Sequence, residues 1–189
     1  MQEYDYDLQS VQAARDLARK GQVAANQIAN YSAEQIDRIL CAMVEVAEKN
    51  AVELAEMAVE ETTFGNVHDK IYKNHMASGL LYEQIKDQKT IGVIDVDEKR
   101  QVITIAEPVG LVMGIVPSTN PTSTVLYKSM IAIKARNAIV FSPHPKAAKC
   151  TNLAIRLMND AAVAAGAPEN VIQGVSMATI AATDELMHA

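Results

Sequence analysis

Short apolar runs alternate with helical stretches through the second half of this 189-residue chain, and this alternation restricts the fold most. The runs are GLVMGIV, AIVFS and NVIQGV, and helical patterns follow them over about 122–134, over about 146–165 and from Ala178. Continuous apolar strands between helices are typical of βαβ units, whose parallel sheet is buried on both faces. With right-handed crossovers, such units wind into a Rossmann-like half domain. We therefore predict an α/β fold.

Helical patterns also fill the first 87 residues. Ser32 and Gln35 form a capping box, in which the hydroxyl and the amide satisfy orphan backbone donors at a helix start. The apolar periodicity that follows predicts two helices, or one broken helix, over 33–61. A further helical pattern runs over about 67–87.

A weaker helical pattern spans residues 8–29 and is interrupted at Gly21. Short amphipathic N-terminal helices also serve as cargo tags for protein shells. The apolar face here is narrow, which favours an ordinary first helix of the fold. A bacterial-type microcompartment is therefore not indicated.

Two β-rich runs, TIGVIDVD and QVITIAEP, flank a charged turn over 97–100. They predict an antiparallel hairpin that protrudes from the α/β body. An isolated hairpin is marginally stable in water and leaves strand edges unpaired. We expect it to join a larger sheet, supplied by other residues or by another subunit.

Charge and hydropathy exclude two kinds of partner. The net charge is −6 and no Lys/Arg cluster is present, which argues against a nucleic-acid phosphate backbone. The longest apolar run, 110–116, is far below the roughly 20 residues that span a bilayer, so we expect no membrane segment. The acidic start, MQEYDYDL, does not resemble a secretory signal.

Cys41 and Cys150 lie far apart, which favours reduced, structural thiols and a cytoplasmic location.

Ligands of open α/β sheets bind beyond the carboxyl ends of the strands, so the turns after the apolar runs are the candidate sites. In the first turn, PSTNPTS, the amide of Asn120 could donate a hydrogen bond to a developing oxyanion. The residues alone favour a helix cap, because Asn is among the best N-caps. In the second turn, SPHP, His144 could meet a ribose or a phosphate, but a turn role is favoured because no partner is evident. The third turn lacks the GxGxxG fingerprint.

Other polar residues receive no chemical role. His68 and His75 lie two helical turns apart without a third ligand at metal spacing, so we expect no metal site. Glu60 and Glu61 are adjacent, so their side chains diverge, and we interpret them as a solvated face.

Four segments resemble the acylating branch of the aldehyde dehydrogenase superfamily: AVEETTFGNVHDKIYKNHMAS, EPVGLVMGIVPSTNPTS, KARNAIVFSPHPKAAK and AAGAPENVIQGV. The resemblance extends from about Ser32 to the end of the chain. It implies NAD- or NADP-dependent oxidation of an aldehyde, with transfer of the acyl group to coenzyme A. It further implies a division in which residues 1–87 and 109–189 form part of a dinucleotide-binding domain. Residues 88–108 would then be an oligomerisation hairpin, and the catalytic domain would lie outside the chain.

The resemblance also assigns individual residues. Asn120 matches the oxyanion-hole amide, and the hairpin over 90–107 would build a homo-oligomer. The nicotinamide side of the cofactor would meet Ile115, Val116, Pro117 and Ser118. The adenosine half would face Ser142, Pro143 and His144.

Two departures refine this interpretation. Non-acylating relatives carry Lys-Pro-Ser-Glu where this chain has SPHP, which favours the acylating branch and leaves NAD and NADP both open. The family's catalytic cysteine would fall beyond Ala189, and neither Cys41 nor Cys150 matches its motif. We therefore expect an incomplete aldehyde dehydrogenase-like fold, part of an enzyme that converts a short aldehyde to its acyl-CoA through a cysteine thioester. The chain alone should be inactive. A non-acylating dehydrogenase fragment and a standalone, non-catalytic binding or assembly module remain the alternatives.

Overall fold

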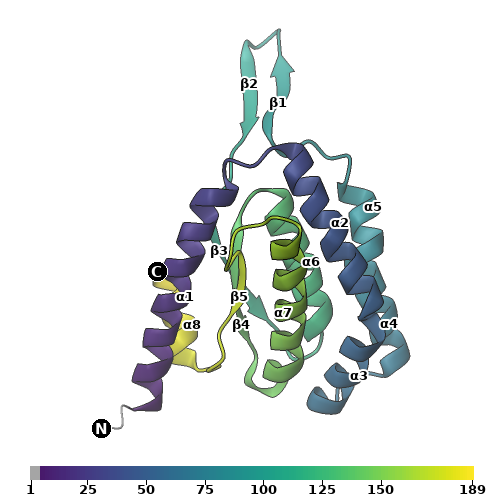
Figure 1. Ribbon diagram of the computed structural model, residues 1–189, viewed down its shortest axis with the longest axis vertical. Helices are drawn as coiled ribbons and strands as arrows, with labels where there is room; N and C mark the ends of the chain where they lie inside the picture. The colour runs from purple at the N-terminus through teal and green to yellow at the C-terminus, as the bar shows by residue number, and fades with distance from the viewer. Residues whose placement is uncertain (1–4) are drawn as a thin grey trace.

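The computed structural model describes residues 5–189 and has the predicted α/β architecture (Figure 1). The first four residues, part of the acidic stretch that argues against a secretory signal, lie outside the described residues. The N-terminal helices are α1 (Tyr6–Ile28), α2 (Ala33–Lys49), α3 (Ala51–Thr62), α4 (Val67–His75), the π-helical turn η1 (Met76–Leu80) and α5 (Leu81–Ile85). The hairpin is β1 (Gly92–Asp97) and β2 (Val102–Ala106). The remaining elements are β3 (Leu111–Val116), α6 (Pro121–Lys134), β4 (Ala138–Pro143), the 3-10 turn η2 (Pro145–Ala147), α7 (Ala148–Ala164), β5 (Ile172–Gly174) and α8 (Ile180–His188).

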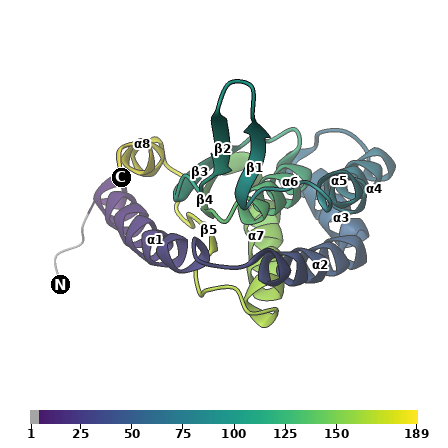
Figure 2. The same ribbon diagram turned by 90° about the horizontal axis from the view of Figure 1, so that it is seen from above.

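The elements pack in layers around one parallel sheet of order β3-β4-β5 (Figure 2). Helices α1 and α8 lie on one face of the sheet, and α6 and α7 cover the other. Helices α2 to α5 pack against the outer side of α6 and α7. The main apolar core fills the space between these layers; its largest buried side chains include Leu40, Met43, Leu126, Met130, Phe141 and Met158.

The sheet is less covered than the sequence predicts. Strand β4, in the centre, is buried along its whole length. Strand β3 is at an edge, and Ile115 on it is 55% exposed. The expectation of burial on both faces is thus right for β4 and wrong for β3, where a hollow of about 810 Å³ is lined by residues of β3, α1 and α8. The third strand is also shorter than the run NVIQGV predicts.

Gly21 does not interrupt the first helix, contrary to the prediction. Helix α1 runs unbroken from Tyr6 to Ile28 across the sheet. A Cβ at Gly21 would lie 2.7 Å from Leu111 Cδ1 and 2.9 Å from Gln173 Nε2. The glycine is therefore a point of close approach between the helix and two strands, which offsets its unfavourable helix propensity. The prediction of an ordinary first helix of the fold is confirmed.

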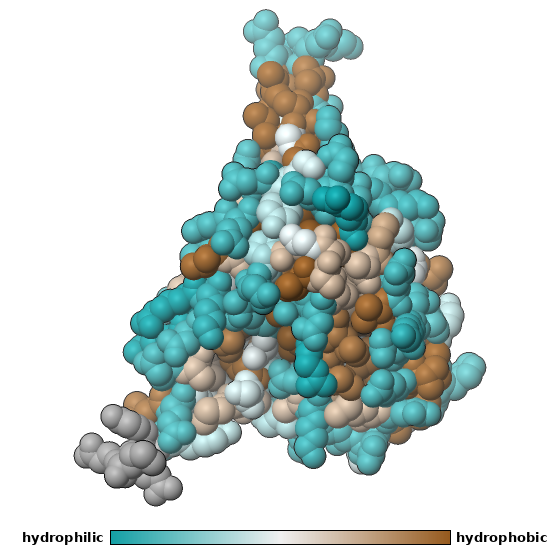
Figure 3. Space-filling view, viewed as in Figure 1, coloured by the Kyte–Doolittle hydropathy of each residue, from teal (hydrophilic) through white to brown (hydrophobic). Residues whose placement is uncertain are grey.

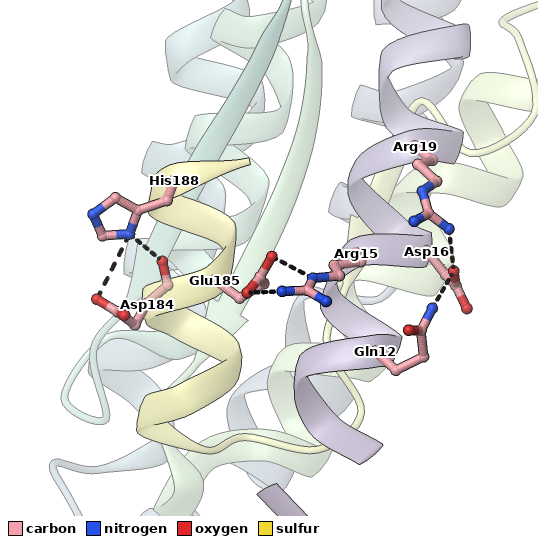
Figure 4. Close-up of polar contacts among 7 residues, drawn as sticks. All are labelled: Gln12, Arg15, Asp16, Arg19, Asp184, Glu185 and His188. Atoms are coloured by element: carbon pink, nitrogen blue, oxygen red, sulfur yellow. Dashed lines mark hydrogen bonds and ion pairs between the residues drawn. The ribbon is translucent and has the colours of Figure 1, made fainter. Parts of the chain in front are cut away.

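Helix α8 is held against α1 by polar contacts, of which Figure 4 shows the ion pair between Arg15 and Glu185. The Arg15 guanidinium donates from Nε and Nη2 to the two Glu185 carboxylate oxygens at 2.7 and 3.1 Å. This hydrogen bond, with the attraction of the cation, lowers the pKa of Glu185. At the N-cap of α8, Thr179 Oγ1 lies 2.6 Å from Ser10 Oγ on α1. Because the ion pair is exposed, it contributes orientation more than stability.

The hairpin forms its own two-stranded antiparallel sheet and extends away from the body, as predicted (Figure 3). Its strands carry exposed apolar side chains, namely Val93, Ile94, Val96, Val102, Ile103 and Ile105. Figure 3 shows them as an apolar stalk below a hydrophilic tip. Among residues 5–189, no helix has the length and apolar character that a bilayer crossing requires.

Candidate active site

The predicted cofactor residues come together where two parallel strands end. In the register of β3 and β4, Ile115 pairs with Ser142 and Val116 pairs with Pro143. The His144 backbone N–H donates to the Val116 carbonyl at 3.1 Å and extends this pairing by one residue. A pocket of about 370 Å³ opens here; it is lined by Ile115, Val116, Pro117, Ser142, Pro143, His144 and Pro145, and by Ala178, Thr179, Ile180 and Thr183 at the start of α8. Ser118 is the one predicted cofactor residue that does not line it.

The polar groups of this pocket are already partly engaged. Ser142 is buried, and its hydroxyl lies 2.7 Å from Thr183 Oγ1. His144 is exposed, and its Nδ1 accepts a hydrogen bond from the Lys146 backbone N–H at 3.1 Å. The imidazole therefore caps η2, and its Nε2 makes no contact in this cap. With Nδ1 as an acceptor, the neutral ring carries its proton on Nε2.

Asn120 occupies the N-cap position of α6, but its side chain does not cap the helix. Its Oδ1 instead accepts a hydrogen bond from Lys73 Nζ at 3.0 Å. The helix cap that the residues favour is therefore wrong as a side-chain role. Pro121 stands at the first position of α6, where proline is favoured because its missing backbone N–H would have no intrahelical partner. The Asn120 amide is thus available for another purpose.

A row of polar residues on α4 holds the turn that contains Asn120. Lys70 Nζ donates to the Thr119 carbonyl at 2.9 Å, and Asn74 Oδ1 accepts from the Thr122 hydroxyl at 2.9 Å. With Lys73 between them, these residues have the spacing i, i+3, i+4, which places them on one helix face. Burial, followed by repulsion from Lys73, lowers the pKa of Lys70. This row was not predicted from the sequence. The segment DKIYKN could have indicated it, because its polar residues recur at the spacing of one helix face.

Asn120 faces a second pocket, separate from the first. Its volume is about 360 Å³, and its lining residues are Lys73, Met76, Ala77, Asn120, Ser123, Thr124 and Tyr127. The two pockets share no lining residue, and the chain passes from one to the other within Pro117–Asn120. A larger hollow, between α1, β3 and α8, contains Ile115 but none of the other residues singled out for chemistry. We place the candidate site at the two smaller pockets, because the predicted residues converge there.

The two cysteines have different surroundings, and those of Cys150 are not the surroundings of a nucleophile. Cys150 is fully buried at the start of α7, and burial together with the Glu61 carboxylate raises the pKa of its thiol to about 12. Cys41 is exposed on α2, with Sγ 3.1 Å from the Tyr82 hydroxyl. A reactive thiol needs a lowered pKa and access to solvent, and Cys150 has neither. The prediction of a structural thiol fits the geometry of Cys150.

Thiol labelling tests this assignment. Iodoacetamide at pH 8 is expected to modify Cys41 and to leave Cys150 unmodified in the folded chain, because a thiol with a pKa of about 12 is almost entirely protonated there. Mass spectrometry of tryptic peptides measures the two sites separately. In urea both should react. Labelling of Cys150 at the same rate as Cys41 under native conditions would contradict the assignment.

Glu61 is not part of a solvated face, contrary to the sequence interpretation. Its carboxylate oxygens accept hydrogen bonds from the backbone N–H groups of Lys149 and Cys150, at 2.8 and 2.7 Å. It thereby caps α7, whose N-cap residue, Ala147, has no side-chain acceptor. A negative charge at this helix end also interacts favourably with the helix dipole.

The histidines on α4 have no metal-binding arrangement in the described part of the chain. His68 is exposed and lies near Asp69 alone. His75 Nδ1 lies 2.6 Å from Glu48 Oε2, and the same carboxylate accepts from Ser78 and Gly79 in the π-helical turn. Over residues 5–189, no group of three His, Cys, Asp or Glu side chains is placed to hold a metal ion.

Comparison with known proteins gives concordant matches. The model of the aldehyde dehydrogenase family matches residues 2–189. The chain is 45% identical over 172 residues to the bifunctional aldehyde-alcohol dehydrogenase of Escherichia coli strain K12, covering 91% of this chain and 19% of that protein. It is 41% identical over 175 residues to the acetylating succinate-semialdehyde dehydrogenase of Clostridium kluyveri, covering 93% of this chain and 39% of that protein.

Solved structures agree with these sequence matches. The crystal structure of an acetylating aldehyde dehydrogenase from Geobacillus thermoglucosidasius superimposes with a TM-score of 0.94 at 52% identity, covering 98% of this chain and 41% of that one. The chain therefore spans from about a fifth to two fifths of the length of these relatives. Its similarity is to acylating, oxidoreductase members. The chain belongs to the aldehyde dehydrogenase family.

Proposed function

We propose that this chain is the N-terminal part of an NAD(P)-dependent enzyme that oxidises a short aldehyde to its acyl-CoA through a cysteine thioester. The observation that carries the proposal is the Asn120 amide. Its oxygen is held by Lys73, and its Nδ2 has no acceptor among the described residues, at a pocket between α4, η1 and the start of α6. The relatives are acetylating dehydrogenases, and their activity supplies the reaction class.

The pocket at the strand ends fits part of a dinucleotide. Its walls are mostly apolar side chains, including Ile115, Pro117 and Pro143, which offer flat surfaces to a heteroaromatic ring. We assign residues 115–118 to the nicotinamide side, and Ser142, Pro143 and His144 to the adenosine half. Because the Ser142 hydroxyl is bonded to Thr183, His144 Nε2 and the backbone are the polar groups left for recognition. When bound, the cofactor supplies an acceptor for the hydride of the substrate.

Asn120 has the chemistry that an acyl-transfer oxyanion requires. A cysteine thiolate, contributed by polypeptide outside these 189 residues, would add to the aldehyde carbon and leave negative charge on its oxygen. The neutral amide donates a hydrogen bond to that oxygen without titrating. After hydride loss, the thiol of coenzyme A takes the acyl group from the cysteine. Because neither Cys41 nor Cys150 matches the motif of the family's nucleophile, the chain alone is expected to show no turnover.

A single assay tests the proposal. The full-length protein that carries this segment is incubated with acetaldehyde and either NAD or NADP, with and without coenzyme A, and reduced cofactor is followed at 340 nm. We expect reduced cofactor to accumulate only when coenzyme A is present, with acetyl-CoA as the product. Turnover independent of coenzyme A would instead identify a non-acylating dehydrogenase. A polypeptide that is inactive under all conditions would support a standalone binding or assembly module.

The hairpin over residues 90–107 is the proposed oligomer contact. Its six exposed apolar side chains would be covered by pairing with another subunit, which would also satisfy its free strand edges. Replacing Ile103 and Ile105 by Asp should shift the full-length protein to a smaller species in light scattering. The matched control is an Asp substitution at exposed Val52 on α3, which should leave the mass unchanged. An unaltered mass for the hairpin variant would exclude this contact.

A further inference from the structure

The turn that carries Asn120 is held by two cations that have no anionic partner among the described residues. Lys70 is 5% exposed, and its ammonium is bonded to the neutral Thr119 carbonyl. Lys73 is bonded to the neutral amide of Asn120. In residues 5–189, no carboxylate forms a salt bridge with either lysine. Lys70 is buried, where an unpaired charge is costly, and Lys73 is exposed beside it. Together the two cations give the turn a positive potential.

The Lys73 contact fixes which way the amide faces. Oδ1 accepts from the ammonium, and a flipped amide would bring Nδ2 against Nζ, where two donors meet. The amide therefore has one favourable orientation, with its N–H groups directed away from Lys73. A hydrogen bond from a cation also polarises the amide, which strengthens its N–H groups as donors.

The other two residues of the α4 row, Lys70 and Asn74, restrict the backbone conformation of the turn. Lys70 holds the carbonyl that precedes Asn120, and Asn74 holds Thr122 in the first turn of α6. Asn74 is itself fully buried and donates to the Ala51 carbonyl at 2.9 Å. The backbone on both sides of Asn120 is thus anchored to one helix, and only the side-chain amide is left for Lys73 to orient.

We infer that Lys73 is a positioning residue, which holds the Asn120 amide with its N–H groups toward the oxygen of the bound aldehyde and strengthens them as donors. The inference rests on the proposed oxyanion role of Asn120 and adds a residue to it. Lys73 acts through Asn120 and does not itself contact the reacting atoms. Its effect should therefore appear in the transition state more than in substrate binding.

Variants of the full-length enzyme test this role. Lys73→Met keeps the length of the side chain and removes its charge and donors; we expect kcat to fall about tenfold while KM for the aldehyde changes less than about twofold. Lys73→Arg keeps a charged donor and should recover most of kcat. Lys20→Met, at an exposed lysine on α1, is the matched control and should leave both constants unchanged. A raised KM with unchanged kcat would overturn the inference, because it would mean that Lys73 binds substrate directly.

A double-mutant cycle separates this inference from the proposed function. If Lys73 acts through Asn120, adding Lys73→Met to Asn120→Ala should lower kcat by less than about twofold further. A full tenfold loss in that background, or an unchanged kcat for Lys73→Met alone, overturns the inference and leaves the oxyanion role of Asn120 in place. A normal kcat for Asn120→Ala would overturn the oxyanion role itself, and the inference with it.

Discussion

Asn120→Ala is expected to lower kcat of the full-length enzyme by roughly two to three orders of magnitude. A single oxyanion donor contributes about 3 to 4 kcal/mol to transition-state stabilisation, because it is fixed in place before charge develops. Asn120→Asp should be at least as damaging, since a carboxylate has the same shape but cannot donate when ionised. Steady-state kinetics at saturating coenzyme A measures both. Asn26→Ala, at an exposed asparagine on α1, is the control.

The same variant separates the two roles that the sequence allows for Asn120. A capping side chain typically stabilises a protein by about 1 kcal/mol, so its removal would lower the free energy of unfolding by that amount. Because Asn120 makes no capping bond in the structure, we expect urea denaturation of Asn120→Ala to differ little from that of the parent. A destabilised variant with a normal kcat would support the cap and contradict the catalytic role.

Phe141→Ala is expected to reduce the free energy of unfolding by about 3 to 5 kcal/mol. Phe141 is fully buried in the central strand and is the largest of the fully buried side chains. Its ring lies against Gly114 of the neighbouring strand, where an added Cβ would be 2.7 Å from Phe141 Cδ1. The tight fit of ring against backbone leaves no side chain able to fill the space, so truncation creates a cavity at the centre of the sheet.

Phe64→Ala is the matched control, since it removes the same atoms at an exposed position. Phe64 follows α3 and is 46% exposed, so its loss should cost less than about 1 kcal/mol. Urea denaturation followed by circular dichroism compares the two variants. Equal destabilisation by both would contradict the assignment of Phe141 to the core.

The local elements were predictable because their signals are local. Ser32 accepts from the Gln35 backbone, and Gln35 Oε1 accepts from the Ser32 backbone at 2.8 Å, which is the reciprocal cap that the spacing predicts. The apolar runs became parallel strands, and the charged turn closed an antiparallel hairpin. Hydrophobic periodicity and capping depend on residues within one or two turns, so a single sequence records them.

The sequence predicts which residues form the candidate site, but not which residues they contact. Ile115–Pro117 and Ser142–His144 were expected to lie together, because each segment stands at the carboxyl end of a strand. Parallel strands have their carboxyl ends on the same side of the sheet. The partners of Asn120 were not evident: Lys73 lies 47 residues before it on another helix. Similarly, the cap of α7 comes from Glu61, 88 residues before Lys149.

By itself, the sequence determined the order and type of the elements and the turns where chemistry is placed, since each depends on neighbours along the chain. Only the tertiary structure decided what Gly21, Glu61 and Lys73 do. Packing of α1 on the sheet makes Gly21 a contact point where the sequence suggests a break. Packing of α3 beside α7, and of α4 beside α6, gives Glu61 and Lys73 their hydrogen-bond partners. These roles depend on which helix faces meet in space, and a local periodicity does not specify that.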